Sequence, residues 1–158
     1  MHMAVSANYE STSPLDGKIN FSGSENKDQA QADPTNLRVR EFFELSLQGT
    51  DMVSISACET NIGSLHNKAV SELRNYFLGD ELVSFTRALF YAGASSTITT
   101  LWQIDDETSA ELMVKFYHYW QEQGLSKIEA LSRAQLDIRQ NYPNPYYWSG
   151  MILSGNWW

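Results

Sequence analysis

The stretch VSISACETNIG, residues 53–63, places the only cysteine of the chain at the end of an apolar run. Met52 or Val53 alternates with Ser54, and Ile55 with Ser56, which predicts a strand over 52–57. Cys58 therefore follows a strand, and in open parallel sheets reacting groups sit just beyond the carboxyl ends of strands. A free cysteine is also among the most often buried residue types. Position alone leaves two interpretations open: a catalytic nucleophile, or a small hydrophobe that closes a buried strand.

Strand and helix patterns alternate on both sides of this stretch. Strands are predicted over 1–7, 18–23, 52–57, 97–101 and 145–155, and helices over 37–47, 67–79, 80–93, 105–124 and 126–141. The last two helices carry apolar stripes, made of Leu112, Met113, Phe116, Tyr117 and Trp120 in one and of Ile128, Leu131, Ala134 and Ile138 in the other. Such alternation predicts an α/β fold with a mostly parallel sheet.

Composition narrows the class of protein. The 158 residues suit one domain over 1–158, and residues 22–36 are so polar that they predict a mobile loop. The net charge is −8 and the 11 basic residues are scattered, which argues against nucleic acid as a partner. Acidity favours basic ligands, although most acidic surfaces simply keep a protein soluble.

The same sequence argues against several other classes. One cysteine excludes an internal disulfide framework, and no apolar run is long enough for a signal peptide or a membrane span. A soluble, cytoplasmic protein without membrane partners is therefore expected. His2, His66 and His118 have no metal-ligand spacing, and there is no glycine-rich phosphate loop. Neither a metal nor a cofactor is expected.

Several motifs resemble one known family. The segments SACETNIG (56–63), GDELVSFTRALFYAGASSTITTLWQIDDETSAELMVKFYHYWQEQGLSKIEALSRAQLDIRQ (79–140) and PYYWSGMILSGNW (145–157) are similar, in this order, to the C-terminal half of a CHAT domain. Upstream, residues 2–23 resemble the family's HxAxHG motif and NPLxSGLxL hairpin, and residues 37–59 resemble its approach to the cysteine, LTxxEIFxLxLxxxDLVVLSACE. CHAT domains are caspase-like cysteine peptidase modules of bacteria, often attached to TPR repeats.

The resemblance implies a fold. A caspase-like domain is a three-layer sandwich, a mostly parallel sheet with helices on both faces. The family's domain has further elements upstream, so a chain truncated at its N-terminal side, or one part of a larger assembly, is expected. Residues 61–79 lengthen the loop that follows the cysteine in the family.

The resemblance also implies a catalytic site with one departure. Cys58 takes the position of the nucleophile, but Ser6 stands where the family has its general-base histidine. Ala7 stands where the family has an oxyanion-hole glycine, and a backbone N–H from alanine can serve as well. Among the histidines, His66 in the lengthened loop is a candidate base or a solvated loop residue, and His118 is assigned to surface or packing.

Acidic residues suggest a pocket for a basic substrate residue. Asp105 and Asp106 follow the strand over 97–101, and one of them suits the N-cap of the next helix, which leaves the other for the pocket. Glu59 either lines that pocket or orders the loop through backbone N–H groups. Trp102 is assigned to packing.

Three functions follow. The first is a cysteine endopeptidase that acts after Lys or Arg in a peptide or protein substrate, downstream of a sensor or TPR region. The second is a pseudopeptidase that binds a peptide or partner protein without cleaving it, as Ser6 indicates. The third is an unrelated flavodoxin-like binding module, which lacks support because nothing in the sequence cradles a phosphate.

Overall fold

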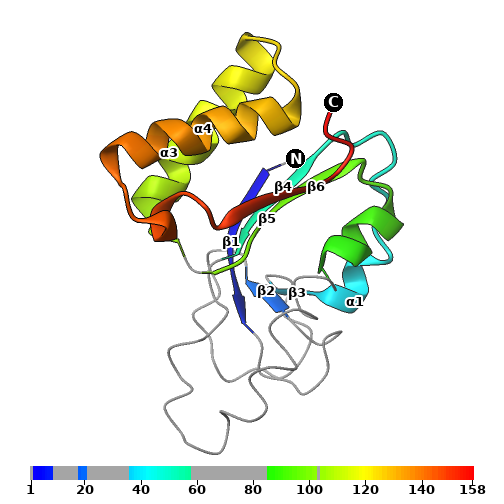
Figure 1. Cartoon of the computed structure of the whole chain (residues 1–158). Coiled ribbons are helices and arrows are strands. Elements are labelled where there is room, and N and C mark those ends of the chain that lie inside the picture. The colour runs from blue at the N-terminus through cyan, green and yellow to red at the C-terminus, as the bar shows by residue number, and fades with distance from the viewer. Residues whose placement is uncertain (1, 9–17, 21–35, 58–84, 103) are drawn as a thin grey trace, which may run out of the picture.

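The computed structural model describes residues 2–8, 18–20, 36–57, 85–102 and 104–158, and these form one mixed sheet with helices on both faces (Figure 1). The strands, in the sheet order β3-β2-β1-β4-β5-β6, are Asn36–Arg38, Lys18–Asn20, His2–Asn8, Val53–Ala57, Ser96–Thr100 and Met151–Gly155. The predicted α/β class is confirmed. The loops predicted over 22–36 and 61–79 and the helix predicted over 67–79 lie outside the described residues, apart from Asn36.

The expectation of a mostly parallel sheet is wrong. Only the β1–β4 and β4–β5 ladders are parallel in the described sheet, and the other three are antiparallel. For the β5–β6 ladder, the connection between the two strands explains the antiparallel direction. It contains two helices that pack against each other, α3 (Asp106–Tyr117) and α4 (Lys127–Asn141), so the chain returns to the edge it left and β6 must run back along β5.

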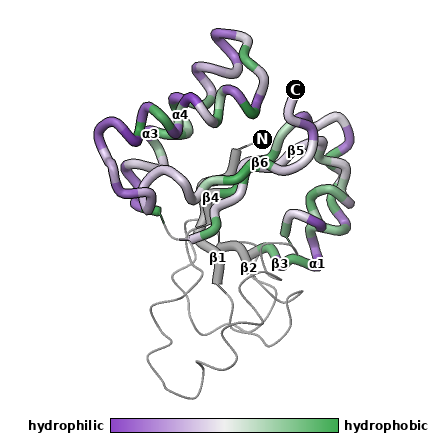
Figure 2. The backbone as a smooth tube through the Cα atoms, viewed as in Figure 1, coloured by the Kyte–Doolittle hydropathy of each residue, from purple (hydrophilic) through white to green (hydrophobic). Residues whose placement is uncertain are grey.

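The central strand β4 is buried on both faces. Val53 and Ile55 belong to a cluster with the helical segment 85–92, whereas Met52 belongs to the cluster under α3 and α4. Ser54 shares that second face, where its hydroxyl donates to the Met113 sulfur at 4.0 Å. Figure 2 shows hydrophobic residues along β6 and hydrophilic ones on the outer turns of α3 and α4. Both faces of β4 are therefore covered, and Ser54 is a buried polar residue on the face under α3 and α4.

The helix predicted over 37–47 is shorter than expected. Residues up to Arg38 pair with β2 as β3, and α1 spans only Val39–Phe42. Val39 and Phe42 are fully buried, and the Phe42 ring meets the Phe85 ring edge to face at 5.6 Å. Tertiary packing of these two side chains therefore ends the strand and turns the chain into the core. The helix predicted over 80–93 is confirmed over 85–92, and it stops at Gly93, whose φ is 109°.

Both C-terminal helices are confirmed, with two corrections. The helix predicted over 105–124 continues beyond α3 as the π-helical turn η3 (His118–Glu122). In α4 the inward residues are Lys127, Ala130, Leu131, Ala134 and Ile138, whereas Ile128, which the sequence places on the apolar stripe, is 46% exposed. The capping box of Ser126 and Glu129 starts the helix with Lys127 facing inward, which turns Ile128 outward.

Lys127, the first residue of α4, is a buried charged residue. Its side chain is 1% exposed, and its Nζ donates to Asp51 Oδ1 at 2.8 Å and to the carbonyl oxygens of Trp158 at 2.6 Å and Asn156 at 3.4 Å. The ammonium also lies 5.5 Å from the centre of the Trp120 ring. These contacts tie the last residues of the chain to the start of α4 and to the turn before β4.

The strand predicted over 145–155 begins later than expected. Asn144 caps the short helix η4 (Pro145–Tyr147), and β6 starts only at Met151. Between them, Gly150 lies under the Trp102 ring, so closely that a Cβ at this position would approach Trp102 Cε2 at 2.8 Å. The Trp102 Nε1 donates to the Tyr146 carbonyl at 3.0 Å, which confirms that Trp102 packs against this segment.

Candidate active site

The carboxyl ends of β1 and β4 lie side by side. The parallel register pairs His2 with Ser54 and Val5 with Ala57. Ser6 comes next in β1 after Val5, and Cys58 comes next in the chain after Ala57. Cys58 itself, like Glu59 and His66, lies outside the described residues. The structure thus brings Ser6 to the edge of the sheet at which β4 leads into the cysteine.

On its other side, β1 is paired with β2. The backbone of Ser6 lies opposite Asn20, and that of Ala7 lies opposite Ile19. The two ladders cover successive parts of β1, since β4 pairs with His2–Val5 and β2 pairs with Ser6–Asn8. The backbone of Ser6 and Ala7 is therefore held by β2, directly beyond the last residue that β4 pairs.

The carboxyl end of β5 lies at the same edge, because β5 is parallel to β4 with Ile55 opposite Thr99. The chain leaves β5 through Leu101 and reaches α3 at Asp105. Leu101 is 41% exposed. The sequence analysis does not name Leu101 as a candidate site residue. Its position directly after β5 is the sequence feature that could have identified it.

The two aspartates before α3 have different roles. Asp105 is the N-cap: its Oδ2 accepts from the Thr108 N–H at 3.1 Å, and its carbonyl accepts from the Thr108 hydroxyl at 3.0 Å. Asp106 is the first helical residue and is exposed, and within the described ranges no hydrogen bond or ion pair of its carboxylate is found. One aspartate therefore caps the helix, as the sequence predicted, and the carboxylate of the other is exposed.

Neither described histidine lies at this edge. His2 lies at the opposite end of β1, where it pairs with Ser54. His118 lies at the far end of α3, about 20 Å from Asp105 at helical rise. Its ring contacts Glu122 Oε2 at 2.7 Å and Gln123 Nε2 at 3.0 Å, and it is exposed, so its assignment to the surface is confirmed. The described part of the edge carries a serine, an aspartate and an apolar leucine.

The described residues contain no group of three or more histidine, cysteine or carboxylate side chains arranged to hold a metal ion. No helix among them has both the length and the apolar character that crossing a bilayer requires.

Comparisons with known proteins identify the family. The family model named CHAT domain matches residues 1–156. A search of curated proteins and a search of solved structures each returned no match.

Proposed function

Because this chain belongs to the CHAT domain family, which is caspase-like, we propose that it is a cysteine endopeptidase domain with Cys58 as its nucleophile. The observation that carries the proposal is the parallel β1–β4 register, with Val5 level with Ala57. The described end of β4, from which the sequence continues to Cys58, lies at the edge at which parallel sheets collect reacting groups. Helices on both faces of the sheet support a caspase-like three-layer sandwich.

The proposed reaction has two steps. The Cys58 thiolate attacks the carbonyl carbon of the peptide bond, and the oxyanion is stabilised by the N–H groups of Cys58 and Ala7. The C–N bond breaks as the leaving amine takes up a proton, and water then hydrolyses the thioester. A serine hydroxyl neither accepts the thiol proton nor protonates the amine at neutral pH. The base must therefore come from outside β1, and His66 is the candidate.

We propose a substrate with Lys or Arg before the cleaved bond. The support is the exposed carboxylate of Asp106, at the start of the helix that follows β5, and the net charge of −8. A carboxylate forms charge-assisted hydrogen bonds with ammonium and guanidinium groups. A peptide or protein made available by an upstream sensor or TPR region is the proposed partner, in a cytoplasmic setting.

A second candidate function is a pseudopeptidase that binds such peptides without cleaving them. The observation in its favour is Ser6, since the β1–β4 ladder leads to a hydroxyl where the family motif has its imidazole. An unperturbed thiol with a pKa near 8.5 is only a few per cent ionised at pH 7, so the loss of the base removes most of the nucleophile.

Fluorogenic peptides ending in Arg or Lys separate the two candidates. Hydrolysis that Cys58→Ala abolishes and His118→Gln preserves supports the endopeptidase. His66→Ala then tests the base. Peptide binding without turnover, at the same affinity in Cys58→Ala, identifies the pseudopeptidase. If the peptides neither bind nor react, both candidates are wrong.

Asp105 and Asp106 form a matched pair for the substrate pocket. Asp106→Ala is expected to raise the KM or Kd for an Arg peptide about tenfold, because one charge-assisted pair is lost. A citrulline peptide of the same shape should be unaffected. Asp105→Ala should instead lower the free energy of unfolding by about 1 kcal/mol through loss of the helix cap, as urea titration will show. Equal losses for the Arg and citrulline peptides in Asp106→Ala would contradict the proposed pocket.

A further inference from the structure

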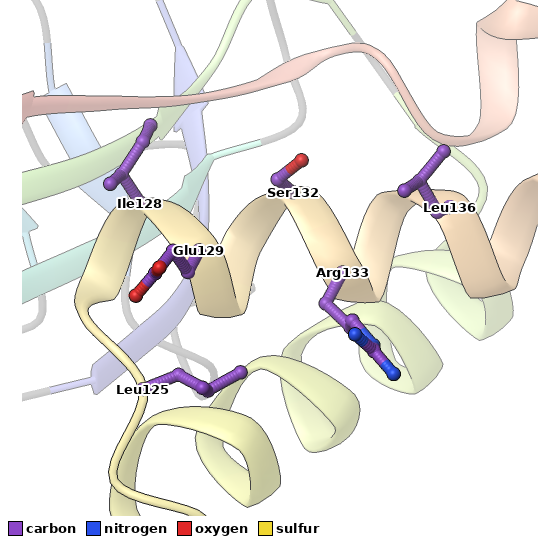
Figure 3. A pocket seen from close by; sticks show the side chains of 6 residues that line it. All are labelled: Leu125, Ile128, Glu129, Ser132, Arg133 and Leu136. Carbon is purple, nitrogen blue, oxygen red and sulfur yellow. The ribbon is translucent and has the colours of Figure 1, made fainter.

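A groove runs along the outer face of α4. It has a volume of about 410 Å³ and is lined by Leu125, Ile128, Glu129, Ser132, Arg133 and Leu136. Figure 3 shows Ile128, Ser132 and Leu136 in one row along the helix, with Glu129 and Arg133 in a second row beside them. The groove lies on the side of α4 that faces away from the sheet, so it is separate from the candidate active site.

The first row is apolar at both ends and small in the middle. Ile128 is 46% exposed and Leu136 is 51% exposed, although both are large hydrophobic residues on a helix whose opposite face is fully packed. Ser132 lies four residues from each of them, at the centre of the row. Residues at this spacing form a continuous ridge on a helix, and a small side chain at the centre allows a second helix to approach closely.

The second row carries one charge of each sign, one helical turn apart. The Glu129 Oε2 accepts from the Ser126 hydroxyl at 2.5 Å and from the Ser126 N–H at 3.1 Å, and these hydrogen bonds lower the pKa of the Glu129 carboxyl. Glu129 therefore keeps its charge at neutral pH. The Arg133 guanidinium lies 5.9 Å from the centre of the Tyr119 ring, which orients it along the groove. Both charges have defined positions next to the apolar row.

We propose that this face of α4 binds the same face of a second copy of the chain, with the two helices antiparallel across a two-fold axis at Ser132. Such an axis places Ile128 opposite Leu136 of the second copy, and Leu136 opposite its Ile128. Glu129 and Arg133 of the second copy then lie at heights along the helix axis that differ by only about 3 Å. Each chain contributes the same pairs in reverse, which is the self-complementarity that a two-fold interface requires.

The surface beside the groove also favours binding of a second copy of the chain. The Ile128 N–H donates to the Trp157 carbonyl at 3.3 Å, so the C-terminal residues lie against the start of α4. Trp157 and Trp158 are 53% and 77% exposed, and they extend the apolar surface at that end. One helix face with this extension is smaller than a standard stable interface, so the expected Kd is on the order of 10–100 µM.

A cysteine at the axis tests the geometry directly. In a Cys58→Ser background, Ser132→Cys should form a disulfide-linked dimer under mild oxidation at about 100 µM protein, because residues at the axis come within the Cα separation of about 4.4–6.8 Å that a disulfide needs. The control is Val114→Cys, a position on α3 that is 70% exposed and off this face. Cross-linking of Ser132→Cys no faster than that of Val114→Cys would overturn the proposal.

Charge reversal tests the pairing independently of stability. Arg133→Glu and Glu129→Arg should each raise the dimer Kd about tenfold in sedimentation experiments, because each places two like-charge contacts in the interface. An equimolar mixture of the two variants should recover the wild-type Kd, because both contacts are then between opposite charges. Damage to the fold would not be repaired by mixing. A mixture that associates no more tightly than either variant alone, or self-association that neither reversal changes, would show that the second copy does not bind here.

Discussion

Ser6→His is expected to raise the rate of Cys58-dependent hydrolysis of an Arg peptide by about 10²–10⁴-fold, the usual contribution of a positioned acid–base group. The physical reason is the β1–β4 ladder. Val5 is level with Ala57, so a histidine at position 6 stands on the neighbouring strand at the point where β4 leads into Cys58. The rate should also acquire a dependence on a group that titrates near pH 6.5, the ordinary pKa of histidine.

Two variants control this experiment. Asn8→His places an imidazole on the same strand, about 6.7 Å further along, and should leave the rate near that of the wild type. The double variant Ser6→His, Cys58→Ala should be inactive. If Ser6→His has no effect while the Arg peptide still binds, the end of β1 does not face the thiol and the proposed dyad geometry is wrong.

Lys127→Ala is expected to lower the free energy of unfolding by about 3–5 kcal/mol, measured by urea titration. The substitution removes a long side chain from a site that is 1% exposed, and large-to-small changes in a core cost this much. It also leaves the Trp158 and Asn156 carbonyl oxygens without the ammonium that they accept from. Fluorescence of the C-terminal tryptophans should change, because their anchor on α4 is lost.

Matched variants separate packing from charge at this position. Lys127→Met keeps most of the buried side-chain volume, so it should cost only about 1–2 kcal/mol. Asp51→Asn should cost less than about 1 kcal/mol, because the Asp51 side chain is 59% exposed and water replaces the ion pair there. A loss in Lys127→Met as large as in Lys127→Ala would mean that the hydrogen bonds, and not the packing, hold this corner.

Local patterns in the sequence were sufficient for most elements. The alternation of apolar residues with Ser54 and Ser56 over 52–57 predicts β4, and the apolar stripe over 126–141 predicts α4. The aspartates before α3 likewise indicate a helix cap. Which of them fills it depends on the path of the chain out of β5, so only the structure assigns Asp105 to the cap and leaves Asp106 exposed.

Strand direction and the buried face of α4 could not be predicted from local sequence patterns. The sequence shows strands alternating with helices, but the antiparallel direction of β6 follows from the pairing of α3 with α4, which brings the chain back to the same edge. The inward face of α4 was misassigned at Ile128 because a lysine was not expected inside. Lys127 is buried because Asp51 and the C-terminal carbonyl oxygens, far away in the sequence, converge on its ammonium.

The sequence by itself determined the family, the α/β class and the identity of the residues at the ends of the strands, including the serine in place of the family's histidine. Each of these depends on residue type and local order, which are properties of the chain alone. Only the tertiary structure decided that β1 runs parallel to β4 with Val5 level with Ala57, and that α4 turns Ile128 and Leu136 outward. Strand register and helix orientation arise from contacts between distant segments, because the free energy that selects them comes from burying both partners together.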